Sequence, residues 1–183
     1  AEILRVLEAE NRVVGVSSSI PGKYAELFPV MADKPIIGGF TDPNYEVIVE
    51  VDPQILINYP GRVPELEESI EDTDVKVVFM GFDYKGIDFN QEVEVLGYIL
   101  GKRDEADEFL NWKEEYRNII KSRTDGLKDE ERVPVFVGKD GVDYLFQTAT
   151  QGTAWHEVVT AAGGKNIAAD MGIESNFVVD QEW

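Results

Sequence analysis

Three aromatic residues each follow a segment whose sequence predicts a β-strand. Phe40, Tyr59 and Phe82 come just after runs of apolar, largely β-branched residues, and Arg62 adds a cation close to Tyr59. In open parallel sheets, ligands bind outside the carboxyl ends of the strands. Each aromatic residue could by itself simply cap the core of the sheet. Three of them at one predicted edge indicate a binding site.

Nucleophilic catalysis finds little support in the sequence. The hydroxyls of Ser17–Ser19 would need a neighbouring base, and His156 is the only histidine of the chain. His156 precedes Glu157 on a predicted helix, where adjacent side chains do not face each other. We therefore expect His156 to be a packed or surface residue of that helix, or to lie near a ligand. The sequence also lacks the glycine-rich phosphate-binding motifs and the nucleophile-elbow motif.

The chain is strongly acidic. Its 183 residues include 17 lysines and arginines and 36 acids, which gives a net charge of −19. Such a surface repels a phosphate backbone, so we expect no nucleic-acid partner. The absence of cysteine excludes disulfides and cysteine-ligated metals. The even spread of the acids favours a solvated surface, with a cationic ligand or a basic docking surface as the alternative.

The elements that position these residues alternate between strands and helices in the first part of the chain. Strands are predicted over 12–16, 34–40, 54–58 and 75–81. A helix is predicted to start within 41–46, with Thr41 or Asp42 as its cap and Pro43 in its first turn. This alternation predicts a parallel sheet that is covered on both faces.

The second part of the chain opens with two helices, over 88–100 and about 104–127, and the longer one is long enough to bridge two lobes. A second α/β block follows, with strands over 133–137 and 142–147, a turn at 139–141, a helix over 153–162 and an extended segment at 177–179. The chain opens on a helical apolar pattern without a cap and closes directly after an apolar run. We expect it to be the central piece of a longer protein.

Several segments, taken in chain order, resemble one family. They are Val13–Ser18, Lys34–Phe40, Pro43–Ile48, Val51–Ile57, Leu96–Lys102 with Ala106, and Trp155–Ala168. Together these segments resemble the helical-backbone, or class III, solute-binding proteins that serve ABC importers of iron–siderophores, haem and cobalamin. The resemblance covers nearly the whole chain.

The resemblance implies an α/β fold of two lobes with mostly parallel sheets, joined by a long linking helix, with the second lobe incomplete. The lobes would be residues 1–87, without their first strand, and residues 128–183, with the linking segment at 88–127. The protein would be extracytoplasmic and would bind a metal chelate in a preformed cleft between the lobes. It would have no catalytic activity, no cofactor and no metal site of its own.

The resemblance also assigns residues. The ligand would meet Ser18, Ser19, Phe40, Tyr59, Arg62, Phe82, Thr148, Trp155 and His156. Aromatic faces would cover a planar or apolar ligand, and Arg62 would meet a carboxylate or an oxygen-rich chelate. Glu46 and Glu182, each at a helix start, would bind arginines of the permease, which works with an ATPase. For Glu46, stabilisation of its own helix by the dipole is the alternative.

Two other classes of function stay open at this point. One is an α/β enzyme that acts on a small molecule, such as a chelatase-like protein or a carboxylate-based hydrolase. The other is a sensory or partner-binding module on the same fold. A partial lobe would also expose sheet edges, so the chain could self-associate.

Overall fold

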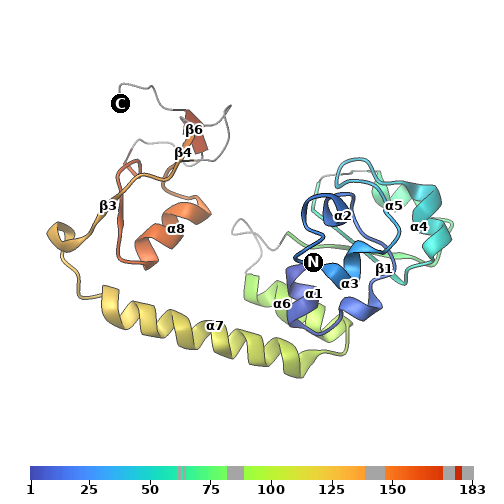
Figure 1. Cartoon of the computed structure of the whole chain (residues 1–183), viewed down its shortest axis with the longest axis horizontal. Coiled ribbons are helices and arrows are strands. Elements are labelled where there is room, and N and C mark those ends of the chain that lie inside the picture. The colour runs from blue at the N-terminus through green and yellow to red at the C-terminus, as the bar shows by residue number, and fades with distance from the viewer. Residues whose placement is uncertain (62, 64, 82–88, 139–146, 171–175, 179–183) are drawn as a thin grey trace. The chain divides into compact units, whose positions relative to one another are not determined.

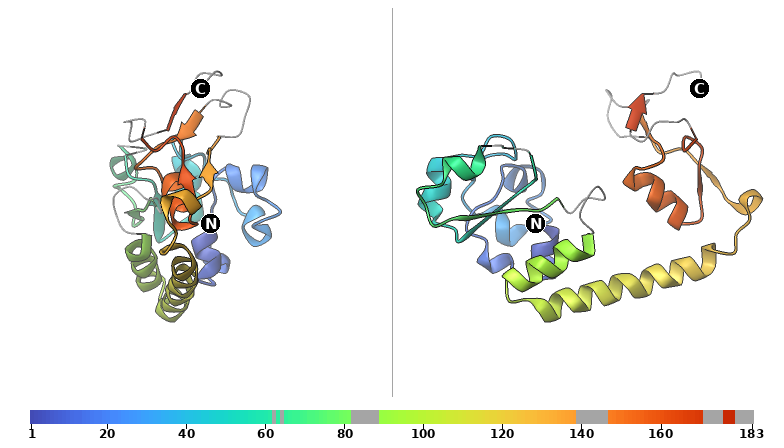
Figure 2. Two further views of the ribbon diagram at one scale, coloured as in Figure 1. Left: turned by 90° about the vertical axis from the view of Figure 1, so that its left-hand side faces the viewer. Right: turned by 180° about the vertical axis from the view of Figure 1, so that it is seen from behind.

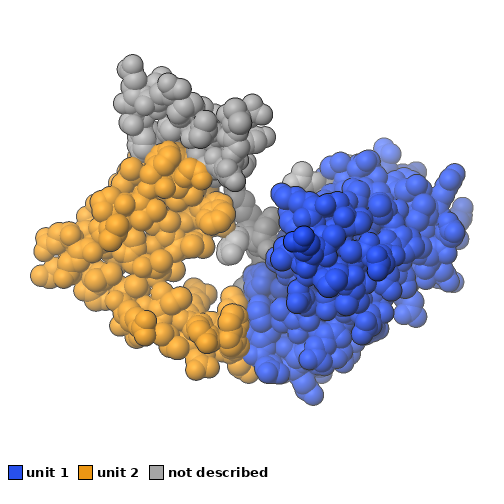
Figure 3. Space-filling model, in the orientation of Figure 1, with its two compact units in different colours: residues 1–109 blue, residues 110–183 orange. Residues whose placement is uncertain are grey.

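The computed structural model describes residues 1–61, 63, 65–81, 89–138, 147–170 and 176–178 (Figure 1). The chain forms two compact units, Ala1–Phe109 and Leu110–Trp183, which Figure 3 shows in two colours. Each unit has its own strands and helices and is described separately. None of the helices within the described ranges is both long and apolar enough to cross a membrane.

The first unit consists of one parallel pair of strands and several helices. Its elements are α1 (Glu2–Val6), η1 (Glu10–Arg12), α2 (Ser19–Lys23), α3 (Pro29–Ala32), α4 (Tyr45–Val51), β1 (Ile55–Asn58), α5 (Leu66–Ser69), β2 (Lys76–Phe79) and α6 (Phe89–Ile99). Strands β1 and β2 are parallel, in a register that pairs Ile55 with Lys76 and Asn58 with Phe79. Both strands confirm the sequence prediction, although each is shorter than predicted.

The two strands predicted before β1 are reduced to a single parallel bridge between Val16 and Ile36. The Val16 amide donates to the Pro35 carbonyl, and the Val16 carbonyl accepts from the Ile37 amide, both at 2.9 Å. The prediction of full strands over 12–16 and 34–40 was therefore wrong. The first begins as the 3₁₀ turn η1, and the second ends where Gly38 takes a φ of +96°.

Helix α4 begins later than predicted. Asn44, and neither Thr41 nor Asp42, is its cap, because the Asn44 side chain accepts from the Val47 amide at 3.2 Å. The Asn44 backbone is extended and donates to the Ile37 carbonyl at 2.9 Å, so the chain cannot turn into the helix before this residue. Pro43 accordingly precedes the cap and does not lie in the first turn.

Two apolar clusters hold the first unit together. The first joins α4, β1 and α5 through buried side chains: Ile48, Leu56, Leu66, Ile70 and Val75. The second joins the loop before α2 to α3 and consists of Val16, Ile20, Phe28 and Met31. The first cluster packs against the strand pair and the second against the loop that follows Val16.

The second unit receives the chain through a long helix. Helix α7 spans Arg103–Thr124, so it starts in the first unit and continues into the second. The remaining elements are η2 (Asp129–Glu131), β3 (Pro134–Val135), β4 (Gln147–Ala149), α8 (Ala154–Ala161), β5 (Lys165–Asn166) and β6 (Asn176–Val178). The predicted turn at 139–141 lies outside the described residues.

Strands β3 and β5 are parallel, whereas β4 and β6 are antiparallel. Helix α8 packs against β5, and Figure 2 shows the helix beside the strands of its unit. Thr153 caps α8 by accepting from the His156 amide at 3.3 Å, and Gly163, with a φ of +82°, follows its end as predicted. The α/β fold class with mostly parallel pairing is thereby confirmed.

Candidate functional site

The first candidate surface is built where the loop after Val16 meets the turn after Ile36. The Ser18 amide donates to the Gly38 carbonyl at 2.9 Å. The hydroxyls of Ser17 and Ser19 lie 2.8 Å apart, within hydrogen-bonding distance. The predicted residues Ser18 and Ser19 therefore lie beside the segment that carries Phe40.

Phe40 and Tyr59 come together although they are far apart in the sequence. Their ring centroids are 5.3 Å apart and their planes meet at 77°, an edge-to-face contact. Phe40 remains 48% exposed. The two aromatic rings predicted at one edge are thus in contact, although Phe40 follows a single bridge and not a full strand. Their contact with a ligand stays a prediction. Arg62 and Phe82 lie outside the described residues.

A glycine turn places Phe40 at this edge. At Gly38, a Cβ would lie 2.4 Å from the Asp42 carbonyl oxygen and 2.7 Å from the Asn44 amide nitrogen. Because both are backbone atoms, no other residue fits here without moving the chain. The Gly39 amide closes the turn by donating to the Asp42 carbonyl at 3.2 Å.

A buried acid, which the sequence analysis did not single out, lies at the neighbouring strand end. Glu92 on α6 is 5% exposed, and its Oε1 accepts from the Gly81 amide at 2.8 Å. The Met80 amide donates to the Asn58 carbonyl at 2.9 Å, so the ends of β1 and β2 are tied together. The sequence signal was weak, because a single acid on a helix is usually exposed.

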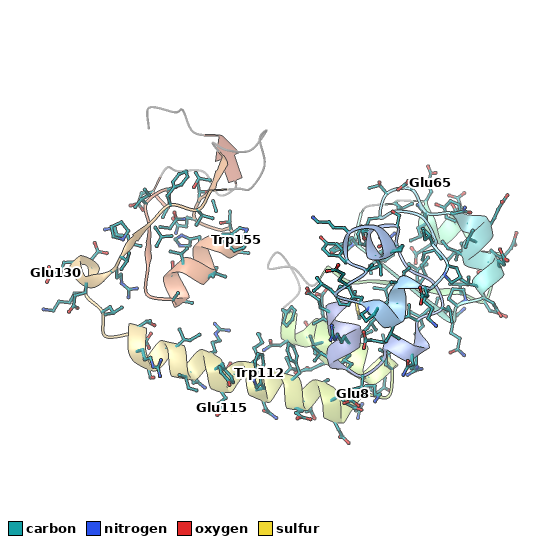
Figure 4. All side chains as sticks on the ribbon, in the orientation of Figure 1. Glu8, Glu65, Trp112, Glu115, Glu130 and Trp155 are labelled. Carbon is teal, nitrogen blue, oxygen red and sulfur yellow. The ribbon has the colours of Figure 1, made fainter. Side chains whose placement is uncertain are left out.

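The second candidate surface lies in the second unit, around β4 and α8. Trp155, labelled in Figure 4, stands in the first turn of α8 and is 59% exposed. Thr148 on β4 is only 2% exposed, and its hydroxyl has no hydrogen-bond partner in the described part of the chain. His156 is half-buried. All three residues lie in the second unit, and their contact with a ligand stays a prediction.

Asn166 connects the strand β4 and the helix α8, which form this second surface. Its Nδ2 donates to the Ala149 carbonyl at 2.7 Å and lies 3.4 Å from Nδ1 of His156. Its Oδ1 accepts from the Ala168 amide at 3.1 Å. The sequence analysis included Asn166 in the family signature but gave it no role. The only available signal was a polar residue between Lys165 and the apolar Ile167, directly after a pair of glycines.

The predicted docking residue Glu46 is exposed and lies in the first turn of α4. It forms no ion pair with any residue that the structure describes. A carboxylate at this position is stabilised by the positive end of the helix, so both interpretations of Glu46 fit its placement. Glu182 lies outside the described residues.

Two further features complete the description. Across the described ranges, no three histidines or acids come together as a metal site would require. A groove of about 400 Å³ lies in the second unit, lined mainly by apolar side chains. Its lining includes Val133, Val135, Val158 and Gly164, and none of the predicted ligand-binding residues.

Comparison with known proteins places the chain in a family. The model of the family described as "Periplasmic binding protein" matches residues 1–183, so the chain belongs to this family of binding proteins. The family confirms the resemblance drawn from the sequence and agrees with the expectation that the chain is not an enzyme. No curated protein matches the sequence.

Solved structures share the fold at low sequence identity. The haem-binding protein HutB of Vibrio cholerae is 16% identical, with a TM-score of 0.77 over 99% of this chain. The molybdate-binding protein MolA of Haemophilus influenzae is 19% identical, with a TM-score of 0.80 over 98% of this chain. The vitamin B12-binding protein BtuF of Vibrio cholerae is 18% identical, with a TM-score of 0.66 over 99%.

The chain spans only part of these proteins. It covers 66% of HutB, 61% of MolA and 67% of BtuF. These likenesses establish the fold.

Proposed function

We propose that the protein is the extracytoplasmic solute-binding component of an ABC importer, which captures an iron chelate, haem or a corrinoid and delivers it to a permease and its ATPase. The observation that carries this proposal is the aromatic pair Phe40 and Tyr59 at the strand-end edge of the first unit. The family match and the haem- and B12-binding structural neighbours support the class of ligand.

The two candidate surfaces offer different chemistry to such a ligand. Phe40 presents a half-exposed ring that suits a planar or apolar face. The surface of the second unit presents Trp155 together with the polar group of His156. A large chelate has an apolar body that can pack on aromatic rings and oxygen-rich groups that can accept hydrogen bonds. An isolated oxyanion has no apolar surface to pack on the exposed aromatic rings.

Fluorescence titration tests the class of ligand. The chain has 3 tryptophans and 7 tyrosines, so binding of hemin, cobalamin or a ferric siderophore should quench the intrinsic emission. Molybdate serves as the oxyanion comparison. We expect a saturable response to at least one chelate and none to molybdate; a response to molybdate alone would overturn the proposed ligand class.

Variants at the aromatic edge sharpen this test. Phe40→Ala should weaken binding of the responding chelate by about fivefold, since losing one well-placed aromatic contact costs on the order of 1 kcal/mol. Tyr98→Ala is the matched control, because Tyr98 is 65% exposed on α6 of the same unit and is not among the predicted ligand residues. An equal loss in both variants would argue against a site at Phe40.

The docking role of the acids can be tested separately from binding. We propose that Glu46 and Glu182 contact arginines of the permease. Glu46→Ala and Glu182→Ala should then reduce transport in cells while leaving the affinity for the chelate unchanged. Glu50→Ala is the control for Glu46, because Glu50 is exposed on the same helix. A matching loss of chelate affinity would reject the docking role.

A further inference from the structure

The orientation of the Asn166 side-chain amide is fixed by two backbone groups. Asn166 is 5% exposed on β5. Its Nδ2 donates to the Ala149 carbonyl at 2.7 Å, and its Oδ1 accepts from the Ala168 amide at 3.1 Å. Exchanging the two atoms would set two oxygens against each other at the first contact and two N–H groups at the second. Only one orientation of the amide is therefore compatible with its surroundings.

This orientation decides the protonation pattern of the imidazole of His156. The second hydrogen of the Asn166 Nδ2 is available to His156 Nδ1, 3.4 Å away. An amide nitrogen donates and does not accept, so Nδ1 of His156 must be the acceptor. The neutral ring then carries its single proton on Nε2. No group in the described ranges forms a hydrogen bond with Nε2, and the residue is half-buried.

The arrangement is the reverse of that found at metal sites. A histidine that ligates a metal through one ring nitrogen almost always donates the other ring N–H to a carboxylate, a carbonyl or water. To bind a metal through Nε2, His156 would have to move its proton to Nδ1, where it would face the N–H₂ of Asn166. The two backbone bonds of Asn166 prevent the amide from turning its oxygen toward the ring.

We propose that Asn166 is a positioning residue that holds His156 as a neutral Nε2–H hydrogen-bond donor, so that this surface binds an oxygen acceptor of the ligand and does not ligate its metal. This inference rests on the proposed function for the ligand and extends it. It restricts the ligand to one that presents a carboxylate, hydroxamate, catecholate or similar oxygen to the second unit.

The tautomer can be measured without any ligand. Because His156 is the only histidine, a long-range ¹H–¹⁵N correlation spectrum of labelled protein in mildly alkaline solution reports on this ring alone. We expect the pattern of a single Nε2–H tautomer, with Nδ1 as the unprotonated nitrogen. An Nδ1–H tautomer, or averaging of both forms, would overturn the role of Asn166. This result does not depend on whether the protein binds a chelate.

A substitution should reverse the tautomer. In Asn166→Asp, a carboxylate replaces the amide donor and accepts a hydrogen bond from Nδ1–H of His156, which leaves Nε2 with a free lone pair. We expect the Nδ1–H pattern in the same spectrum, and an unchanged Nε2–H pattern would contradict the proposal. If this variant does not fold, Asn166→Leu removes the donor without adding a charge, and the ring should then show averaging of both tautomers.

The contact to ligand is tested with two probes, hemin and a ferric trihydroxamate. His156→Ala should weaken binding of the trihydroxamate by about 5- to 10-fold, as expected for one lost hydrogen bond. His156→Gln, which retains an N–H donor, should recover part of the lost affinity.

Hemin spectra of the wild type and His156→Ala should be superimposable. Loss of a histidine-ligated iron spectrum in His156→Ala would overturn the inference, as would unchanged trihydroxamate affinity. Failure of every chelate to bind would instead reject the proposed function, with the tautomer measured independently.

Discussion

The two candidate surfaces are held by different kinds of interaction. In the first unit, the backbone positions the surface that carries Phe40, through the bridge between Val16 and Ile36 and the turn at Gly38. In the second unit, a buried side chain, Asn166, links two strands and a helix. A surface placed by the backbone tolerates side-chain changes but not changes in dihedral angle. A surface placed by one side-chain amide is instead sensitive to substitution of that side chain and tolerates small changes in backbone dihedral angle.

The largest expected effects come from substitutions at two of the glycines with positive φ, Gly38 and Gly163. Gly38→Ala should lower the free energy of unfolding of its unit by about 3 kcal/mol or more, because the new Cβ would meet backbone atoms at 2.4 and 2.7 Å. Gly163→Ala should cost less, about 1–2 kcal/mol, because its nearest atoms, at 2.9 Å, belong to the side chains of Leu127 and Thr124, which can move.

Urea unfolding followed by circular dichroism measures both variants. Gly22→Ala is the control, since Gly22 lies in α2 with no atom within 4 Å of its Cβ position, and it should be neutral or stabilising. A larger loss for Gly163→Ala than for Gly38→Ala would contradict the view that the backbone places the first surface.

The two buried asparagines give the next comparison. Asn166→Ala should cost about 2–3 kcal/mol, because it removes three contacts and leaves the buried Ala149 carbonyl without its donor. Asn58→Ala should cost about 1 kcal/mol, because within the described ranges the Asn58 side chain accepts one hydrogen bond, from the adjacent Tyr59 amide at 2.7 Å. Equal losses in thermal or urea unfolding would remove the distinction between the two surfaces.

A smaller effect is expected at the aromatic pair. A double-mutant cycle of Phe40→Leu and Tyr59→Leu should give a coupling energy of about 0.5–1.5 kcal/mol, the range of edge-to-face ring contacts. Additive losses would mean that the two rings meet without stabilising each other. The cycle is measured by urea unfolding, with both single variants as internal references.

The smallest effects concern one ion pair in each unit, half-buried in the first and exposed in the second. In the first unit, Lys102 hydrogen-bonds Glu105 and lowers the pKa of that carboxyl. The contribution of this pair is therefore present above the ordinary pKa of a glutamate and is lost as the pH falls through the lowered value. In the second unit, the hydrogen bond to Asp129 raises the pKa of Lys165. That contribution is present below the ordinary pKa of a lysine and is lost as the pH rises through the raised value.

Glu105→Gln and Lys165→Met separate these two pH ranges in thermal unfolding. Glu105→Gln should flatten only the acid side of the stability profile, and Lys165→Met only the alkaline side. Both differences should be small and should shrink with added salt, because the pairs are solvent-screened. If the stability difference of one variant does not change with salt, the ion pair removed in that variant acts through packing.

Local sequence patterns predicted the helices with a clear periodicity and the strands made of a continuous run of apolar residues. Strands β1 and β2, the long helix α7 and helix α8 all appear close to the ranges that periodicity predicted. The same rules overextended the segments around Val16 and Ile36, because β-branched content does not reveal where a partner strand ends. They misplaced the cap of α4, since several cap-forming residues precede it and the bond from the Asn44 amide to Ile37 selects among them.

The sequence by itself determined the α/β class, the family, the acidic surface and the prediction that aromatic residues gather at a strand-end edge. The class, the surface charge and the aromatic edge follow from composition and periodicity, whereas the family follows from the resemblance of several segments taken in chain order. Only the tertiary structure decided that Phe40 meets Tyr59, that Glu92 holds the end of β2, and that Asn166 fixes the tautomer of the single histidine. Each of these depends on groups brought together from distant parts of the chain, where a difference of an ångström or of one amide orientation decides which atom donates and which accepts.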